Sequence, residues 1–270
     1  VELLITGDLN DALEFSAELS KYNTERRTLD KSVTDGALEL ITTDEFYRES
    51  KSTVVFNPDW HKGVVGIVAS RLIETYYKPT IVLTESEGKA TGSARSVHGF
   101  DVHAALTECE DLLEQFGGHK YAAGMSLSLE NVDDFRLRFE EVVSSKIEEH
   151  MLVPKLDIEL EIYLDRITPK FMALLKQFAP FGPGNMNPVF VSRNLVATDV
   201  RTMGADNSHL RFTPKQEGVK HVFNKAVAFK MGGLYNDLNS GKRFDLAYTI
   251  EENHWNGNVY LQLNVKDIKL

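Results

Sequence analysis

Three short segments of the 270-residue sequence combine small residues with side chains that bind anions. The first segment, Asp59–Gly66 (DWHKGVVG), lies where an apolar strand pattern gives way to a helical one. Small residues at such a junction let backbone N–H groups and the positive end of the helix dipole approach an anion, with His61 and Lys62 beside it. A plain strand-to-helix turn in which Trp60 fills a gap is the structural alternative.

The second segment, Gly92–Ser96 (GSARS), ends a predicted strand and sets one arginine between two hydroxyl groups. The Arg95 guanidinium can hold a phosphate through two parallel hydrogen bonds, and Ser93 and Ser96 supply neutral donors. The alternative is an exposed arginine that pairs with a nearby carboxylate.

The third segment, Gly117–Gly124 (GGHKYAAG), follows a predicted helix and precedes a predicted strand. Gly117 and Gly118 permit positive φ and close backbone approach, and His119 follows at the tip. A helix C-cap explains a glycine, but not a histidine followed by three small residues. The three segments predict a phosphate-binding site made of His61, Ser93, Arg95, Ser96, Gly117, Gly118 and His119.

No catalytic centre accompanies these anion-binding parts. His98, Asp101 and His103 are of metal-ligand type, but Asp101 is better explained as a helix N-cap and His103 as a first-turn residue. The sequence contains no HExxH, Walker loop, nucleophile elbow or Asp-His-His run. We therefore expect neither a catalytic residue nor a bound metal or cofactor in this chain.

The charge of the chain is unevenly distributed. The net charge of −10 argues against a nucleic-acid binder, and 42% hydrophobic residues exclude wholesale disorder. Residues 1–50 hold 5 basic and 12 acidic residues, whereas Arg166–Lys230 holds 10 basic and 3 acidic ones. The basic segment could neutralise several phosphates if it folded onto one face. Scattered, solvated charges of both signs are the alternative.

Cysteine content and apolar runs indicate the compartment. The single cysteine, Cys109, excludes an internal disulfide framework and a cysteine-based zinc cluster. No apolar run approaches the ~20 residues of a membrane span, and no leader precedes the first structured segment. We expect a cytoplasmic protein without membrane contact. Because the sequence starts at Val1, we also expect a piece of a longer protein.

The pattern of apolar residues predicts two domains after a helical connector. Residues 1–50 predict two acidic helices, at 8–22 and 25–41, whose apolar surface is too small to form a core alone. Residues 51–153 predict an α/β domain because strands alternate with helices. Its expected strands are Thr53–Asn57, Thr80–Thr84, Ala90–Arg95 and Gly124–Leu129, and its expected helices are Val64–Tyr77, Asp101–Phe116 and one that follows Asn131.

Residues 154–270 predict a small β-barrel of about six strands with one short helix at Phe171–Phe178, which fits an oligonucleotide-binding (OB-type) fold. Asn256-Gly257 is the strongest hairpin signal in the chain. Phe223, Phe229, Phe244 and Tyr248 are expected in the barrel core, and Trp255 is expected to plug one end of the barrel rather than stack on a base.

Taken together and in this order, the three segments resemble the DHH-associated domain of the RecJ family, bacterial single-strand-specific 5′→3′ DNA exonucleases of the DHH phosphoesterase superfamily. Three further runs support a resemblance over nearly the whole chain. They are Asn23–Arg27 (NTERR), Pro180–Asn185 (PFGPGN) followed by Asn187-Pro188, and Asn253–Gly257 (NHWNG) followed by Leu261–Leu263. Alanyl-tRNA synthetases and small phosphoesterases share the Gly-Gly-His element but not the Trp-His-x-Gly and Pro-Phe-Gly runs.

The resemblance implies a mixed α/β DHH-associated domain, preceded by connector helices and followed by an OB-type barrel. In that family a preceding DHH domain binds two divalent metals, Mn²⁺ or Mg²⁺, and this sequence begins near the helix that follows it. The metal-binding lobe is therefore expected outside this chain, and the chain alone is expected to be inactive. Carried over to this sequence, Ser93 and Arg95 would hold substrate phosphate, His119 would touch a phosphate near the scissile bond, and His61 would line the same cleft.

The function that the resemblance implies is the C-terminal part of an exonuclease of DNA repair and recombination. Its expected partners are single-stranded DNA, the DHH domain in cis, and single-strand-binding protein or other repair factors. The alternative is a non-catalytic adaptor whose basic barrel binds nucleic acid or recruits a protein. A third hypothesis, hydrolysis of small dinucleotides by a DHH relative, leaves the barrel without a task.

Overall fold

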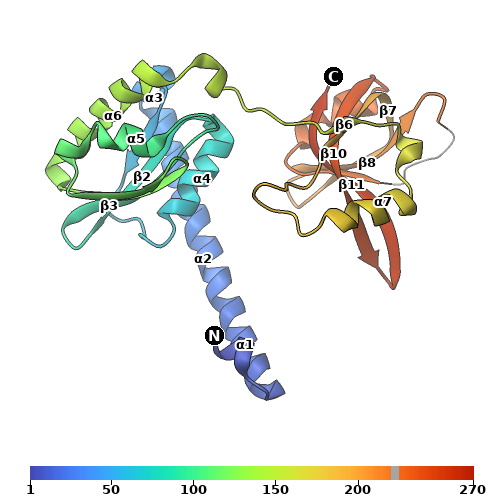
Figure 1. Ribbon diagram of the computed structural model, residues 1–270, viewed down its shortest axis with the longest axis horizontal. Helices are drawn as coiled ribbons and strands as arrows, with labels where there is room; N and C mark the ends of the chain where they lie inside the picture. Colours follow the sequence, from blue (N-terminus) through green and yellow to red (C-terminus); the bar gives the residue numbers. More distant parts are fainter. Residues whose placement is uncertain (220–224) are drawn as a thin grey trace. The chain divides into compact units, whose positions relative to one another are not determined.

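The computed structural model describes residues 1–219 and 225–270, apart from the Trp255 side chain, and the chain divides into two compact units (Figure 1). The first unit spans Val1–Lys155 and the second spans Leu156–Leu270. A mixed α/β unit followed by a barrel confirms the predicted fold class. The expectations for Phe223 and for the Trp255 side chain lie outside the described part of the chain.

The first unit is built on a five-stranded sheet in the order β1-β2-β3-β5-β4, in which only the β1–β2 pair is parallel. Its strands are β1 (Thr53–Phe56), β2 (Thr80–Ser86), β3 (Lys89–Arg95), β4 (Gln115–His119) and β5 (Ala122–Leu127). Its helices are α1 (Glu2–Ile5), α2 (Leu9–Thr43), α3 (Phe46–Glu49), α4 (Val65–Tyr76), α5 (Val102–Thr107) and α6 (Val132–Lys146).

Alternate side chains of the central strands enter two separate cores. Val82 packs on one face with α2 and α4, whereas Ile81 and Leu83 pack on the other face in the core that includes α5 and α6. From α6, Phe135 and Phe139 are fully buried in that second core. Both faces of β1 and β2 are covered, and this explains why these strands are continuous apolar runs in the sequence.

The two helices predicted at 8–22 and 25–41 are in fact one helix, α2. The Asp8 carboxylate caps it by accepting hydrogen bonds from the backbone N–H groups of Asn10 and Asp11. The polar run expected between the helices contains neither Pro nor Gly, and the Thr24 hydroxyl bonds back to the Ser20 carbonyl. Nothing there breaks the helix, so it continues. Figure 1 shows its N-terminal part standing clear of the sheet.

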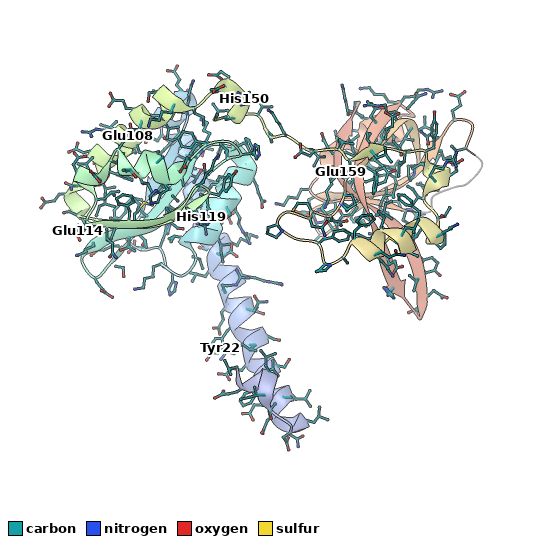
Figure 2. All side chains as sticks on the ribbon, in the orientation of Figure 1. Tyr22, Glu108, Glu114, His119, His150 and Glu159 are labelled. Carbon is teal, nitrogen blue, oxygen red and sulfur yellow. The ribbon has the colours of Figure 1, made fainter. Side chains whose placement is uncertain are left out.

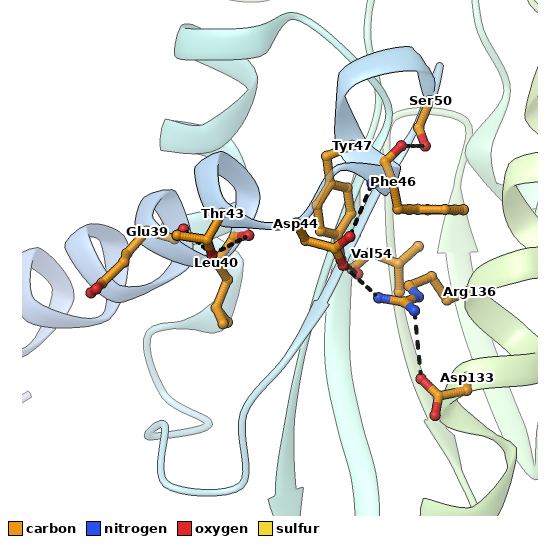
Figure 3. Close-up of polar contacts among 10 residues, drawn as sticks. All are labelled: Glu39, Leu40, Thr43, Asp44, Phe46, Tyr47, Ser50, Val54, Asp133 and Arg136. Atoms are coloured by element: carbon orange, nitrogen blue, oxygen red, sulfur yellow. Dashed lines mark hydrogen bonds and ion pairs between the residues drawn. The ribbon is translucent and has the colours of Figure 1, made fainter.

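The C-terminal end of α2 is joined to α6 through Arg136 (Figure 3). Its guanidinium lies 3.2 Å from the Asp44 carboxylate and 5.0 Å from the centroid of the Phe46 ring. The buried Tyr47 hydroxyl donates to the Val54 carbonyl of β1, and burial raises the pKa of this phenol. These contacts hold α2 and α3 against the sheet.

The helix predicted at Asp101–Phe116 is shorter than expected. Helix α5 ends at Thr107, and Phe116 lies in strand β4, opposite Met125 of β5. The Asp101 carboxylate accepts from the Ala104 N–H, so its prediction as an N-cap is confirmed. After Thr107, Cys109 and Leu112 reach the same core at a short 3-10 helix (Glu110–Leu112), and Phe116 reaches it from strand β4. Pairing with β5 satisfies the backbone groups of Gly117 and Gly118, two residues that disfavour a helix.

The second unit is a closed five-stranded barrel in which β10 pairs with both β11 and β7, as predicted for an OB-type fold. A two-residue strand, β6, adds to β7 in parallel, and a helix α8 that was not predicted accompanies α7. The strands are β6 (Leu160–Glu161), β7 (Phe190–Met203), β8 (His209–Gln216), β9 (Ala226–Ala228), β10 (Phe244–Trp255) and β11 (Asn258–Lys269), and the helices are α7 (Pro169–Leu175) and α8 (Tyr235–Asn239).

The predicted hairpin at Asn256-Gly257 is confirmed. Trp255 pairs with Asn258, and both turn residues have positive φ, 49° and 76°, which this two-residue connection requires. Inside the barrel Phe244 and Tyr248 are buried as expected, and the Tyr248 hydroxyl lies 2.7 Å from the Ser192 hydroxyl. Each buried polar atom of this pair has a partner, so the core keeps a satisfied polar contact.

Candidate nucleic-acid interface

The Arg95 guanidinium is held in place by its own strand. Its Nη1 donates to the Ser93 hydroxyl and to the Ala94 carbonyl, each at 2.8 Å. Both hydrogen bonds use Nη1, and no ion pair occupies the guanidinium among the described residues. The alternative that Arg95 pairs with a carboxylate therefore has no support in the part of the chain that the structure describes. The arginine is oriented and keeps donors for an anion.

Helix α4 approaches this arginine through a glycine. A Cβ atom at Gly66 would lie 3.0 Å from Arg95 Nη2 and 3.2 Å from Ser93 Oγ. Gly66 is the last residue of the first predicted segment and lies in the first turn of α4. The first and second segments therefore meet in space.

The third segment joins them through the sheet. Arg95 of β3 and His119 of β4 both pair with Ala122 of β5, which lies between them. Residues directly opposite each other share a face, so the Arg95 and His119 side chains project on the same side. Two strand spacings separate their backbones by roughly 10 Å. Figure 2 labels His119 in the first unit.

The surface of this face is shallow because its residues are small. Gly117, Gly124 and Ser93 form the neighbouring cross-strand row, and Gly117 and Gly124 are exposed. Helices α2 and α4 cover β1 and β2 on this side but leave β4 exposed. A chain-like ligand can therefore approach the backbone between Arg95 and His119.

Gly118 lies in strand β4, not in the loop predicted after a helix. A Cβ atom there would lie 2.3 Å from the Ala122 carbonyl oxygen and 2.5 Å from Ala123 Cα. Glycine is thus required for the close approach of β4 to β5, and not for a helix C-cap. His119 does lie at a hairpin tip, since only Lys120 and Tyr121 separate it from its partner Ala122.

The two predicted histidines accept backbone hydrogen bonds in the same way. His119 Nδ1 accepts from the Tyr121 N–H at 3.3 Å, and His61 Nδ1 accepts from the Gly63 N–H at 3.0 Å. An accepting Nδ1 places the proton of the neutral ring on Nε2. Each exposed imidazole therefore offers an Nε2–H donor to an anion even when it is uncharged.

The structure does not join His61 and Ser96 to Arg95. The contacts of His61 lie within its own loop, and the neighbouring Lys62 reaches Ser86 and Glu87 at the far end of the β2–β3 hairpin. The Ser96 hydroxyl donates to the Phe100 carbonyl at 2.9 Å and so stabilises the loop after β3. Of the two hydroxyl groups that flank Arg95 in the sequence, only that of Ser93 is hydrogen-bonded to its guanidinium.

A second feature lies on the outer face of the barrel, as a groove of about 850 Å³. Phe229 and Tyr260 line it with 51% and 47% of their surfaces exposed, and Arg211 and Lys225 lie among them. Neither cation has an ion-pair partner among the described residues. The full lining is Met203, Arg211, Lys225, Val227, Phe229, Asn253, Tyr260, Leu261 and Gln262.

The expectation that Phe229 belongs to the core is wrong. Strand β9 ends at Ala228, and Phe229 follows it with half of its surface exposed; its ring makes a T-shaped contact with His209 at 5.3 Å between centroids. Tyr260 was not singled out by the sequence analysis. The alternation of β11, in which Leu263 and Val265 are buried, already places Tyr260 on the outer face.

The basic segment Arg166–Lys230 divides between two uses. Arg211 and Lys225 line the groove, whereas Arg193 is held by Glu161 and Asp245 at 2.8 and 2.7 Å, and Lys176 by Glu252. The charges of Arg193 and Lys176 are thus neutralised by carboxylates that are distant in the sequence. Part of the basic excess therefore lies on one surface, and part stabilises the barrel.

No metal centre occurs within the described ranges 1–219 and 225–270: no three His, Cys, Asp or Glu side chains gather there in a way that could hold an ion. None of the helices in these ranges is long and apolar enough to span a bilayer. Burial raises the pKa of the Cys109 thiol to about 11, which leaves this thiol protonated and unreactive at neutral pH.

Both units match known families. Residues 49–145 match the DHHA1 domain, and residues 158–267 match the RecJ OB domain. Over 269 residues the chain is 36% identical to the single-stranded-DNA-specific exonuclease RecJ of Bacillus subtilis, covering 99% of this chain and 34% of that protein. The chain is similar to RecJ proteins over its whole length.

Other RecJ proteins show the same similarity over the whole chain. The RecJ exonuclease of Haemophilus influenzae is 32% identical over 279 residues, which cover 100% of this chain and 48% of that protein. The crystal structure of Thermus thermophilus RecJ in complex with Mg²⁺ superposes with a TM-score of 0.79 at 29% identity, over 100% of this chain and 40% of that one. A Mn²⁺ complex of the same protein gives 0.78. The chain thus spans between about a third and a half of these RecJ proteins.

Proposed function

We propose that this chain is the substrate-holding part of a RecJ-type 5′→3′ single-stranded-DNA exonuclease of DNA repair and recombination. Ser93, Arg95 and His119 bind backbone phosphates, and the barrel groove holds the single strand. The observation that carries the proposal is the row Arg95, Ala122 and His119, which sets two phosphate-binding side chains on one open face of the sheet.

The chemistry of this face suits a phosphodiester. The Arg95 guanidinium supplies a permanent positive charge, and the His119 imidazole supplies a donor whose direction its own hydrogen bond fixes. Groups oriented in advance stabilise charge that develops on phosphate oxygens during displacement. Gly117, which has open space where a side chain would be, lets the DNA backbone approach this face closely.

Hydrolysis is assigned to residues outside this chain. The Thermus thermophilus relative was crystallised with Mg²⁺ or Mn²⁺, but the described residues here do not fit such an ion. We therefore assign no metal-dependent step to this chain. A DHH domain in cis would supply the metals, Mn²⁺ or Mg²⁺, of the complete cytoplasmic enzyme.

The barrel groove suits the bases of a single strand. Phe229 and Tyr260 are about half exposed, and stacking of bases on aromatic rings contributes about 1–3 kcal/mol per base. Arg211 and Lys225 can neutralise phosphates beside them. Single-strand-binding protein and other repair factors are the further partners that this role implies. The relatives named above are exonucleases, which disfavours the adaptor alternative.

The first test measures binding of a fluorescent single-stranded oligonucleotide and the matching duplex to the chain by anisotropy. We expect tighter binding of the single strand and a fall of log affinity with log salt of about 0.7 per phosphate contacted. Equal affinity for the duplex, or affinity independent of salt, would contradict the proposal.

The second test places Arg95→Ala in the complete enzyme and compares 5′-phosphorylated with 5′-hydroxyl substrates. We expect slower turnover or weaker preference for the phosphorylated end. Lys62→Ala is the matched control, because Lys62 is an exposed cation of the same unit whose contacts are with Ser86 and Glu87. Turnover equal to that of the control enzyme would remove Arg95 from the site.

A further inference from the structure

Helices α2 and α4 share a buried carboxylate that the proposed site does not use. The Asp30 side chain on α2 is fully buried, and its Oδ2 accepts from Arg26 Nη1 at 3.3 Å and from Arg71 Nη2 at 2.9 Å. Its other oxygen, Oδ1, has no partner within the described residues. One carboxylate oxygen thus draws two guanidinium groups together, one from each helix.

The two arginines are oriented but not buried. Their side chains are 40% and 42% exposed, although both bond a carboxylate that solvent does not reach. The Asn23 amide oxygen accepts from Arg26 Nη2 at 3.1 Å and so fixes a second nitrogen of that group. A guanidinium has five N–H donors, so each arginine keeps donors on its exposed side. These three side chains together carry a net charge of +1.

Arg26 and Arg71 are connected to the Arg95 site through helix α4. Arg71 lies five residues after Gly66 on α4, about 7.5 Å farther along the helix axis. Gly66 is the residue that contacts Arg95. Asn23 and Arg26 belong to the Asn23–Arg27 run, which the sequence analysis singled out and the site on the sheet does not use.

We propose that Arg26 and Arg71, held together by Asp30, form a second binding point for a backbone phosphate of the single strand. The proposal rests on the proposed function. Paired guanidinium groups suit a phosphate because they present parallel N–H donors to its oxygens. Asp30 acts as a positioning residue, since its burial keeps it from touching the ligand.

The experiment measures anisotropy of a labelled single-stranded oligonucleotide with the full chain over a range of salt concentrations. We expect Arg26→Gln/Arg71→Gln to weaken binding roughly threefold to tenfold at low salt and to reduce the salt slope by about 0.7. Lys31→Gln removes an exposed cation from the same helix and is expected to leave both values unchanged.

Asp30→Asn separates binding from structure. This variant loses the ion pairs between α2 and α4, as the double variant does, but it keeps both arginines. We expect lower stability and a smaller loss of affinity than in the double variant, because both guanidinium groups remain but are no longer held together by a carboxylate. Equal weakening by Asp30→Asn and by the double variant would show a structural effect and overturn the proposal.

If Arg26→Gln/Arg71→Gln binds the oligonucleotide as tightly as the wild type does, the proposal is overturned as well. If Arg211→Gln weakens binding while the double variant does not, the groove remains supported and this second binding point is rejected. If the wild-type chain binds no single strand, both proposals fail.

Discussion

Gly66 and Arg95 lie so close that a Cβ atom at Gly66 would be 3.0 Å from Arg95 Nη2. Helix α4 therefore fits against the side of β3 that carries Ser93 and Arg95 because one residue of its first turn has no side chain. The contact connects two segments that are 29 positions apart in the sequence. Glycine at this position is not explained by helix stability, which would favour another residue. It is explained by the space that the Arg95 side chain needs.

Gly66→Ala is expected to weaken binding of single-stranded DNA without loss of stability. Alanine favours a helix interior over glycine by about 1 kcal/mol, but its methyl group would displace the Arg95 guanidinium. Oligonucleotide anisotropy and urea unfolding measure the two effects. Gly36→Ala is the control, because a Cβ atom in that helix would meet only Trp60 Nε1, at an ordinary 3.7 Å. Equal affinities in the two variants would contradict this account of Gly66.

Gly118→Ala is expected to destabilise the first unit by at least about 2 kcal/mol, since its Cβ atom would overlap the Ala122 carbonyl. Gly117→Ala has nothing within 4 Å of the added atom and should cost far less. Urea unfolding followed by Trp60 fluorescence in a Trp255→Phe background reports on this unit. Similar midpoints for the two variants would show that β4 can move away from β5.

Phe229→Ala and Tyr260→Ala should each weaken binding of single-stranded DNA, by about 1–3 kcal/mol for each base that loses its stacking partner. The loss should change little with salt concentration, because no charge is removed. Tyr163→Ala is the matched control, since Tyr163 is exposed on the same unit but does not line the groove. A Tyr163→Ala effect as large as the other two would argue against a defined stacking surface.

The barrel should lose stability above pH 10 through Tyr248. Burial raises the pKa of this phenol well above its usual value of about 10, although the hydrogen bond with Ser192 acts in the opposite direction. Below pH 10 the phenol is neutral in both states, and its contribution is complete. Above pH 10 it ionises only in the unfolded chain, which removes up to about 1.4 kcal/mol per pH unit.

Urea unfolding of the wild type and of Tyr248→Phe between pH 9 and pH 11 isolates this contribution, because the other tyrosines are common to both. The wild type should show the steeper decline. Parallel curves would show that Tyr248 does not carry the pH dependence.

The order of elements could be predicted where local pattern and long-range packing agree. Strand β1, helix α4 and the Asn256-Gly257 hairpin carry strong local signals, and they occur within a few residues of the predicted bounds. The continuous helix α2 and strand β4 could not be predicted in this way. In β4, the pairing of Phe116 with Met125 across the sheet outweighs a helical spacing of apolar residues.

Sequence alone determined which side chains are chemically suited to phosphate, the Asn-Gly turn, and the similarity to RecJ proteins that its short runs indicated. Only the tertiary structure decided which of them meet. Arg95 and His119 share a face because the sheet inserts β5 between their strands, Ser96 turns into its own loop, and Phe229 follows strand β9 with half of its surface exposed. Residue type and spacing fix local geometry, whereas strand order and register are set by the packing of residues distant in the chain.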